Sequence, residues 1–217
     1  FEDLRLVRGA GKYSDDISMP GQAIAAFVRS PHAHANIKRI DTSAAHKIPG
    51  VIAVLTGADY VADGLKGAMQ RANPAGAIDI KVRAFAPEKR PVLEEGQYPL
   101  APDRVRYPGE AVAVVIAENL TTARDAAEAV EVEYKVLPAV TDVRQAEGAE
   151  PIWSESCPDN VALDQEFGEA SAVRAAFDSA DLVVEQTFIN QRIVNCQMEP
   201  RSGVASYDPG SDSYTLI

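Results

Sequence analysis

The sequence has 217 residues, of which 46% are hydrophobic and 24% are charged, so a substantial core is expected and overall disorder is not. Its net charge of −11 and its 6% of aromatic residues argue against nucleic-acid binding, because phosphates repel an acidic surface and base stacking needs aromatic rings. No apolar run reaches the roughly 18 residues that a membrane span needs, and two cysteines are too few for a disulfide framework. We therefore expect a cytoplasmic protein that binds neither nucleic acid nor membrane.

The first sixty residues predict a polar arm followed by strands. The arm, residues 1–21, has scattered glycines and is expected to be a loop. Alternating or apolar stretches then predict three strands, at 22–30, 35–41 and 51–55. The last of these, VIAVL, is apolar throughout, which is typical of a central strand. A short helix capped by Asp41 or Thr42 is expected between the second and third strands.

Residues 57–103 mix glycine, proline and charge with short apolar pieces such as Ile78 to Val82. This composition predicts long loops with one or two short strands.

The strongest pattern is RVRYPGEAVAVVIAENLTTARDAAEAVEVEYKVLP, residues 104–138. The unbroken apolar run at 111–117 predicts a strand buried on both faces. Residues 121–130 predict a helix with a narrow stripe of alanines, capped by Thr121 or Thr122. Residues 131–136 alternate and predict a half-buried strand. The strand, helix and strand within residues 104–138 together have the length of a βαβ-type unit.

The C-terminal third predicts a connector and a second module. Residues 138–165 have little periodicity and several prolines, which favours a domain boundary near 140–160. The next patterns predict a helix, a long strand and a hairpin, at 169–177, 181–193, and 203–207 with 213–217. Val173 and Phe177 are expected to face inward. Because Leu216 and Ile217 fall in mid-strand by pattern, we expect a chain that is cut short and pairs with something else.

Four segments resemble the large subunit of the molybdenum hydroxylases, the superfamily of xanthine dehydrogenase, aldehyde oxidase and carbon monoxide dehydrogenase. They are GAGKYSDDI at 9–17, FVRSPHAHANIKRID…IPGVIAVLTGAD at 27–59, the pattern at 104–138, and QMEPRSGVA at 197–205. Together they span most of the chain in the family's order. One difference is Ser202, which stands between Arg201 and Gly203 where the family pattern runs Arg-Gly directly.

The resemblance implies an α+β (mixed α/β) fold with three parts. They are an α/β hammerhead domain with its N-terminal arm at 1–140, a linker at 141–160, and the incomplete first part of a molybdenum-cofactor-binding domain at 161–217. The resemblance also implies a molybdenum–molybdopterin cofactor in the intact enzyme. Its partners would be the remainder of the large subunit, iron–sulfur and flavin subunits or domains, and a small-molecule substrate, and the intact protein is expected to be an oligomer.

Two functional hypotheses follow. In the first, the intact protein is a molybdopterin-dependent oxidoreductase that hydroxylates an aldehyde or an N-heterocycle, or oxidises carbon monoxide, with oxygen from water. The present chain is then scaffold, inactive alone and without bound cofactor, because the family's glycine-rich cofactor segment and catalytic carboxylate lie elsewhere. In the second, the chain is a non-catalytic hammerhead module that docks a partner subunit. An acid/base enzyme using Glu199 ranks last, because no second catalytic group is evident.

Glu199 and Arg201 are the cofactor-binding candidates, at the edge of the expected cofactor domain. A carboxylate and a guanidinium there could orient a pterin phosphate, although a structural ion pair at a domain seam is the more frequent use of such residues. No catalytic and no metal-binding residue is assigned. His32 and His34 lack a third ligand, so a hydrogen-bonded turn is favoured over a metal site.

The sequence also indicates the environment of two further side chains, Cys196 and Glu110. Cys196 is expected to be a buried small hydrophobe rather than a nucleophile. Glu110, in the turn before the apolar run, is expected to be satisfied by backbone donors.

Overall fold

The structure is a computed structural model that describes residues 3–69, 96–153, 155–161, 168–190, 193, 196 and 201–217. It confirms a mixed α and β fold. The chain forms two compact units, of which the larger is Ala23–Ala175 and the smaller combines Phe1–Gln22 with Ala176–Ile217.

The larger unit is organised around β7 (Ala111–Ala117), the apolar run of the sequence. β7 is the centre of a three-stranded sheet of order β1-β7-β3, and it pairs antiparallel with β1 (Ile24–Arg29) and β3 (Val51–Thr56). The predicted burial of β7 is confirmed, because Val112 and Val115 are fully buried. A strand that is covered on both sides can be apolar at every position, and β7 is.

The prediction that residues 51–55 form the central strand is wrong, because β3 lies at an edge of this sheet. Ile52 and Leu55 are accordingly exposed. An apolar run alone does not separate an edge strand from a central one, and here the pairing order decides.

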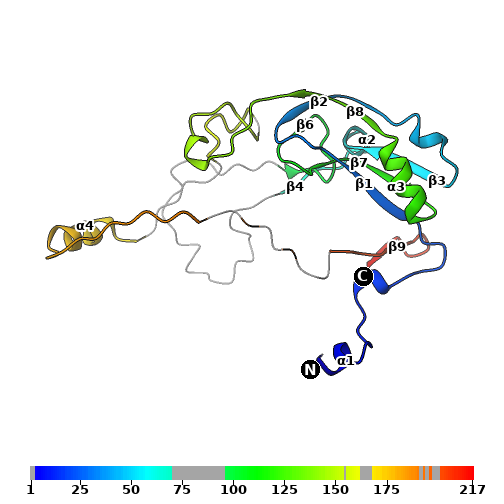
Figure 1. The fold of residues 1–217 in the computed structure, drawn as a ribbon, viewed down its shortest axis with the longest axis horizontal. Helices are drawn as coiled ribbons and strands as arrows, with labels where there is room; N and C mark the ends of the chain where they lie inside the picture. The colour runs from blue at the N-terminus through cyan, green and yellow to red at the C-terminus, as the bar shows by residue number, and fades with distance from the viewer. Residues whose placement is uncertain are drawn as a thin grey trace. The chain divides into compact units, whose positions relative to one another are not determined.

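α3 (Leu120–Glu128) packs on β1 and β7, as Figure 1 shows. Two alanines of the predicted stripe, Ala123 and Ala126, are fully buried. The helix is capped by Asn119, whose Oδ1 accepts a hydrogen bond from the Thr122 N–H at 2.9 Å. The prediction of a threonine cap is therefore wrong by two or three positions. Asn is as good a cap as Thr because its side-chain oxygen has the same reach.

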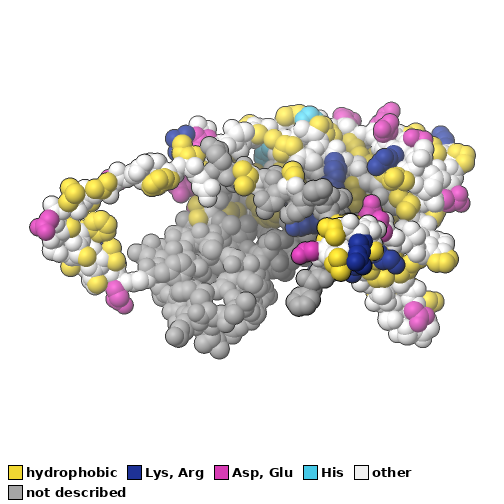
Figure 2. Space-filling view, turned by 60° about the horizontal axis from the view of Figure 1, so that its bottom comes forward, with side chains coloured by type: hydrophobic (Ala, Val, Ile, Leu, Met, Phe, Trp, Pro, Cys, Tyr) yellow, Lys and Arg dark blue, Asp and Glu magenta, His cyan; other side chains and the backbone are white. Residues whose placement is uncertain are grey.

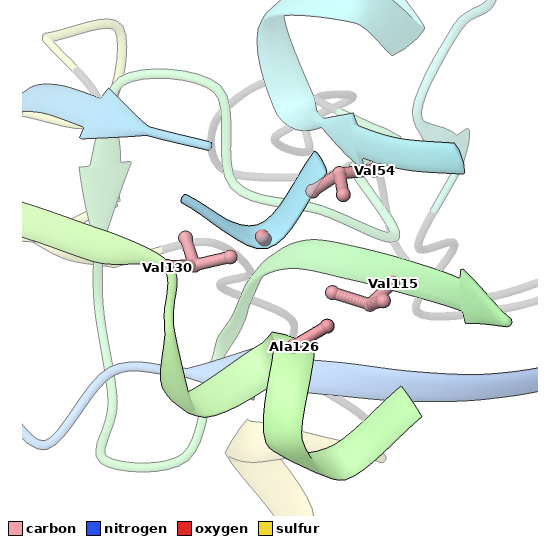
Figure 3. Packing of buried hydrophobic residues seen from close by; sticks show 5 residues of the cluster. Val54, Val115, Ala126 and Val130 are labelled. Atoms are coloured by element: carbon pink, nitrogen blue, oxygen red, sulfur yellow. The ribbon is translucent and has the colours of Figure 1, made fainter. Parts of the chain in front are cut away.

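One hydrophobic cluster joins this helix to the sheet. Val115 from β7, Val54 from β3, and Ala126 and Val130 from the helix and its end converge there (Figure 3). The small alanine lets the helix backbone come close to the sheet, so the two layers pack without a large side chain between them.

A second three-stranded sheet has the order β6-β2-β8 and is also antiparallel. Its strands are β6 (Arg104–Val105), β2 (Ala35–Asp41) and β8 (Glu131–Val136). Ala35 and Val105 pack with Val112 of β7 in a second buried cluster. The unit at 104–138 is therefore no parallel βαβ crossover. Its two long strands lie in different sheets, and α3 connects the sheets.

The loop region after β3 begins with a helix that the sequence pattern did not reveal, α2 (Gly57–Ala62). Thr56 and Asp59 form a capping box, in which the Asp59 carboxylate accepts the Thr56 N–H at 2.7 Å. β4 (Ala68–Met69) and β5 (Gly96–Gln97) form a short antiparallel pair, as predicted for this region. The apolar piece at 78–82 lies outside the described residues.

Short helical turns complete the N-terminal and connecting regions: α1 (Asp3–Val7), η1 (Ser14–Asp16), η2 (Ala45–Lys47) and η4 (Val143–Gln145). The prediction of a loop throughout 1–21 is wrong at α1. The cap expected from Asp41 or Thr42 is wrong, because η2 begins after Ala44 and has no side-chain cap. The Asp41 carboxylate instead accepts the Ser43 N–H at 3.0 Å in the turn before η2. None of the helices in the described ranges has the length and hydropathy to cross a bilayer.

The C-terminal region contains α4 (Ala170–Asp178) and the hairpin of β9 (Ala205–Asp208) and β10 (Ser213–Leu216). Both were predicted within a few residues. The inward orientation expected for α4 is wrong, because Val173 and Phe177 are 54% and 61% exposed. Of the strand expected at 181–193, the described residues 181–190 and 193 pair with no other described residue, and residues 191–192 lie outside the described residues.

Candidate functional site

Of the two residues predicted at the edge of a cofactor domain, the structure describes one. Arg201 is exposed and stands four residues before β9. Glu199 lies outside the described residues. A pair of Glu199 with Arg201, and a contact of either with a cofactor, therefore stay predictions.

The two histidines are structural. The His34 ring is buried, and its Nδ1 lies 2.8 Å from the carbonyl oxygen of Pro138, while the Leu137 N–H donates to the His34 carbonyl. The His32 ring instead meets the edge of the Tyr134 ring at 4.9 Å. Within the described ranges, no three His, Cys, Asp or Glu side chains are grouped so as to hold a metal. The hydrogen-bonded turn expected after Ser30-Pro31 is confirmed, because the His32 N–H donates to Ser30 Oγ at 3.0 Å.

Glu110 is a buried carboxyl at the start of the central strand. It is 5% exposed, and its Oε2 accepts the Arg106 N–H at 2.5 Å. Burial raises the pKa of Glu110, against the opposing effects of the Arg106 and Tyr107 N–H groups and the Arg106 charge. The prediction that backbone donors satisfy this carboxyl is confirmed.

A cavity of about 390 Å³ lies beside this carboxyl. Its lining combines Glu110, Asp103 and Arg106 with the aromatic rings of Tyr98 and Trp153. The lining residues that the structure describes include no Ser, Cys, Lys or His, so its ionisable side chains are the carboxyl groups of Asp103 and Glu110, the Arg106 guanidinium and the Tyr98 phenol. The cavity was not predicted, because its walls come from positions 61 to 153 of the chain.

Two arginines, Arg104 and Arg106, bind Pro151, Trp153 and Glu155 beside β6. Val105 is fully buried between them, so strand alternation places both guanidinium groups on the opposite side. Arg106 Nε donates to the Trp153 carbonyl oxygen at 2.8 Å, and its guanidinium lies 5.2 Å from the centre of the Trp153 ring. Arg104 Nη2 is 3.3 Å from the Glu155 carboxylate. We call Arg104 and Arg106 the arginine clamp.

Asn160 closes the loop that the clamp holds. Its Nδ2 donates to the carbonyl oxygens of Ala146 at 2.8 Å and Glu150 at 3.2 Å, and its Oδ1 accepts the Ile152 N–H at 2.8 Å. The backbone of Asn160 has φ of 60°, a left-handed conformation that Asn tolerates better than most residues. Part of the expected connector is thus an ordered loop. No local sequence pattern indicated its contact with the arginine clamp, because Arg104 and Arg106 bind residues 47 positions further along the chain.

The two cysteines differ in their burial. Cys196 is exposed, so its predicted burial is wrong, and Cys157 is buried. The reason is their surroundings: Cys157 lies in the closed loop, where its carbonyl accepts the Asn160 N–H at 3.1 Å, whereas the described residues around Cys196 are exposed.

Comparison with known protein families gives two matches that follow each other along the chain. The family model of the aldehyde oxidase and xanthine dehydrogenase a/b hammerhead domain matches residues 8–83 and 77–138. The model of the molybdopterin cofactor-binding domain matches residues 153–217.

Individual relatives agree with these matches. The chain is 38% identical to the large subunit of nicotine 6-hydroxylase from Paenarthrobacter nicotinovorans and 35% identical to the large chain of carbon monoxide dehydrogenase from Afipia carboxidovorans. Each alignment covers 99% of this chain, but only 24% and 26% of the relative. The chain therefore spans about a quarter of the length of these curated relatives.

Solved structures show the same likeness. Quinoline 2-oxidoreductase from Pseudomonas putida 86 matches with a TM-score of 0.78 and 33% identity, over 99% of this chain and 25% of that one. Carbon monoxide dehydrogenase from Oligotropha carboxidovorans matches with a TM-score of 0.65 and 33% identity, over 83% of this chain and 22% of that one. The chain belongs to the aldehyde oxidase and xanthine dehydrogenase family of molybdenum hydroxylases and carries its α/β hammerhead domain.

Proposed function

We propose that the intact protein is a molybdopterin-dependent hydroxylase that transfers oxygen from water to an aldehyde or an N-heterocycle, or oxidises carbon monoxide. The observation that carries this proposal is the order of the two matches. A hammerhead domain is followed directly by a cofactor-binding domain, as in enzymes named for nicotine and carbon monoxide. A docking module without catalysis would leave the match over 153–217 without a role, so this second hypothesis is not favoured.

The present chain supplies scaffold and the first edge of the cofactor domain. Of the proposed cofactor residues, only Arg201 is described, and a single exposed guanidinium is no cradle for a pterin. The described residues therefore do not form a molybdopterin site by themselves, and we derive no catalytic step from them. Because the chain is about a quarter of its relatives' length, we propose that it is inactive alone and binds no cofactor.

The domain limits, partners and location belong to the same proposal. We place the hammerhead domain at 1–140, the linker at 141–160 and the start of the cofactor domain at 161–217. The proposed partners are the remainder of the large subunit and iron–sulfur and flavin subunits or domains, since relatives are named as large subunits or as a subunit of a dehydrogenase complex. A cytoplasmic location and an oligomeric assembly stay predictions.

Molybdenum content tests the proposal. Inductively coupled plasma mass spectrometry on the full-length protein is expected to find about one molybdenum per large subunit, and on the purified 217-residue chain none. A full-length protein that folds but carries no molybdenum would contradict the proposed function. Stoichiometric molybdenum in the short chain would contradict its inactivity.

Arg201 can be tested separately. In the full-length protein, Arg201→Ala is expected to lower molybdenum content severalfold if the guanidinium holds the cofactor. Arg174→Ala is the matched control, because Arg174 is an exposed arginine of α4. Equal molybdenum in both variants would remove Arg201 from the cofactor site.

A further inference from the structure

The cavity beside Glu110 lies within the larger unit alone. Its described lining falls between Val61 and Trp153, and that unit runs from Ala23 to Ala175. The unit contains both three-stranded sheets and both hydrophobic clusters, so the cavity does not depend on the placement of the smaller unit. A volume of about 390 Å³ is within the range of small-molecule sites. The cavity is therefore large enough for a small organic ligand.

The aromatic walls of the cavity are held by contacts of their own. The Tyr98 ring meets the edge of the Tyr60 ring, with the ring centres 6.2 Å apart. Trp153 is fixed by Arg106, which binds its carbonyl oxygen and lies over its ring. Walls that are ordered before a ligand arrives lower the entropy cost of binding. The two aromatic rings also offer apolar area to an uncharged part of a ligand.

Two opposite charges of the lining have no counter-ion in the described ranges. Arg106 uses Nε and Nη1 for the carbonyl oxygens of Trp153 and Arg104, and its Nη2 has no partner among the described residues. No described carboxylate forms a salt bridge with Arg106, and the Asp103 carboxylate has neither a salt bridge nor a hydrogen bond with a described residue. Charged groups that are free in this way can form strong, charge-assisted hydrogen bonds with a ligand of opposite charge.

The second carboxyl, Glu110, strengthens the preference for a positive group beside Asp103. Glu110 is 5% exposed and accepts the N–H groups of Arg106 and Tyr107, so Asp103 is the carboxylate open to a ligand. Burial raises the pKa of Glu110 and the Asp103 charge acts in the same direction, so the two carboxyls are close enough to interact. Acidic side chains are scattered over the face that Figure 2 shows, so acidity alone singles out no site. Asp103 differs from them because a cavity with an arginine and two aromatic rings lies beside it.

We propose that this cavity binds a small zwitterion of the amino-acid class. The ammonium group of the ligand pairs with Asp103, its carboxylate accepts a hydrogen bond from Arg106 Nη2, and its apolar side chain lies against the ring of Tyr98. The site goes beyond the proposed function, because it requires neither molybdenum nor the rest of the large subunit.

Ligands with a single charge fit the cavity less well. An amine without a carboxylate leaves Arg106 unpaired and is repelled by its charge. A carboxylate without an amine leaves Asp103 unpaired and is repelled by both carboxyl groups. Each mismatch is expected to weaken binding at least about tenfold, because a like charge in close contact opposes binding.

Tryptophan fluorescence tests the site directly, because Trp153 is the single tryptophan of the chain and lines the cavity. Titration of the 217-residue chain with L-phenylalanine, excited where the ligand does not absorb, is expected to give a saturable change in emission. Phenethylamine lacks the carboxylate, 3-phenylpropanoate lacks the amine, and each should bind at least about tenfold more weakly. No saturable change with L-phenylalanine would overturn the site. Equal affinity for either analogue would also overturn the zwitterion, in favour of a simple cation or anion.

Two substitutions locate the binding within the cavity. Asp103→Asn removes the exposed carboxylate and is expected to weaken L-phenylalanine binding about tenfold, while Asp125→Asn, the same change on the exposed face of α3, leaves it unaltered. Val61→Phe adds bulk at a lining position that is 44% exposed, so it should abolish binding without lowering the urea midpoint. Val143→Phe, at a position that is 75% exposed outside the lining, is its control. Unchanged affinity in both Asp103→Asn and Val61→Phe would contradict the assignment.

Isothermal titration calorimetry extends the test to the full-length protein. L-Phenylalanine is expected to bind there with a dissociation constant within about threefold of that of the short chain. Loss of binding in the full-length protein would overturn the site. Binding by a full-length protein that carries no molybdenum would uphold the site and reject the proposed function, and a molybdenum-loaded protein that does not bind the ligand would do the reverse.

Discussion

The sheet around β7 and the segment at 181–190 place the same apolar residue types in opposite environments. Valine occurs in both, yet Val115 is fully buried while Val184 is 81% exposed. The difference lies in the partners: β7 has β1 and β3 on its edges and α3 across one face, whereas no described residue pairs with 181–190. An apolar sequence pattern thus indicates that a segment favours burial and pairing. Whether it is buried and paired depends on the other strands and helices of the fold.

Glycine substitutions give the largest expected difference between the larger unit, which contains β7 and Gly57, and the smaller unit, which contains 181–190 and Gly203. A Cβ on Gly57 would lie 2.5 Å from the carbonyl oxygen of Ala101, so the backbone must shift, whereas a Cβ on Gly203 would meet nothing closer than 3.5 Å. Gly57→Ala should therefore lower the free energy of unfolding by about 3 kcal/mol and Gly203→Ala by less than about 0.5 kcal/mol. Urea denaturation measures both, and equal effects would break the comparison.

Matched valine truncations sharpen the same contrast. Val115→Ala removes two methyl groups from the cluster with Val54 and Ala126 and is expected to cost about 2 kcal/mol. Val184→Ala removes the same groups from an exposed side chain and should be neutral in the 217-residue chain. A Val184→Ala protein as destabilised as Val115→Ala would mean that the segment is already packed.

Substitution of Arg106 in the arginine clamp tests whether the ordered structure extends beyond the two sheets. Arg106→Ala removes a hydrogen bond to the Trp153 carbonyl and the guanidinium over its ring, so the loop should detach at a cost of about 1–2 kcal/mol. Trp153 is the single tryptophan, so a red-shifted emission that acrylamide quenches more strongly reports this directly. Arg174→Ala should leave the emission unchanged, and an unchanged spectrum in Arg106→Ala would show that the clamp does not hold the loop.

Substitution of Glu110 is expected to give the smallest effect, a change in how the free energy of unfolding depends on pH. Burial raises its pKa in the folded state above the ordinary value of 4.5, so its favourable contribution is complete below that pH and is lost as pH rises through the folded pKa. Glu110→Gln keeps an oxygen for the Arg106 N–H but carries no charge. Its stability relative to the parent should therefore rise with pH above about 4.5. Urea midpoints at several pH values check this, and a constant difference would contradict the buried carboxyl.

Local pattern predicted the elements better than their arrangement. Alternation and apolar runs located β1, β2, β7, β8, α3 and the β9–β10 hairpin to within a few residues, because each depends on its own sequence. The pattern did not place β3 at an edge or separate β7 and β8 into two sheets, because pairing joins residues far apart in the chain. α2 was missed because six residues are too few to show a helical period.

The candidate site likewise combines features that the local sequence predicted with features that it did not. The turn that satisfies Glu110 is formed by neighbours four residues away and was predicted. The cavity beside Glu110 and the clamp on Trp153 join residues more than forty positions apart, so no local pattern indicates them. Cys196 was misplaced because its burial depends on partners that the sequence pattern does not supply.

Assigned carbon-13 chemical shifts of the 217-residue chain test the central contrast most directly. Residues of β7 are expected to have strand shifts and slowly exchanging amides, while residues 182–190 in the same sample have coil shifts and fast-exchanging amides. Strand shifts with slow amides in both stretches would show that residues 182–190 are already paired within the 217-residue chain, and would contradict the account.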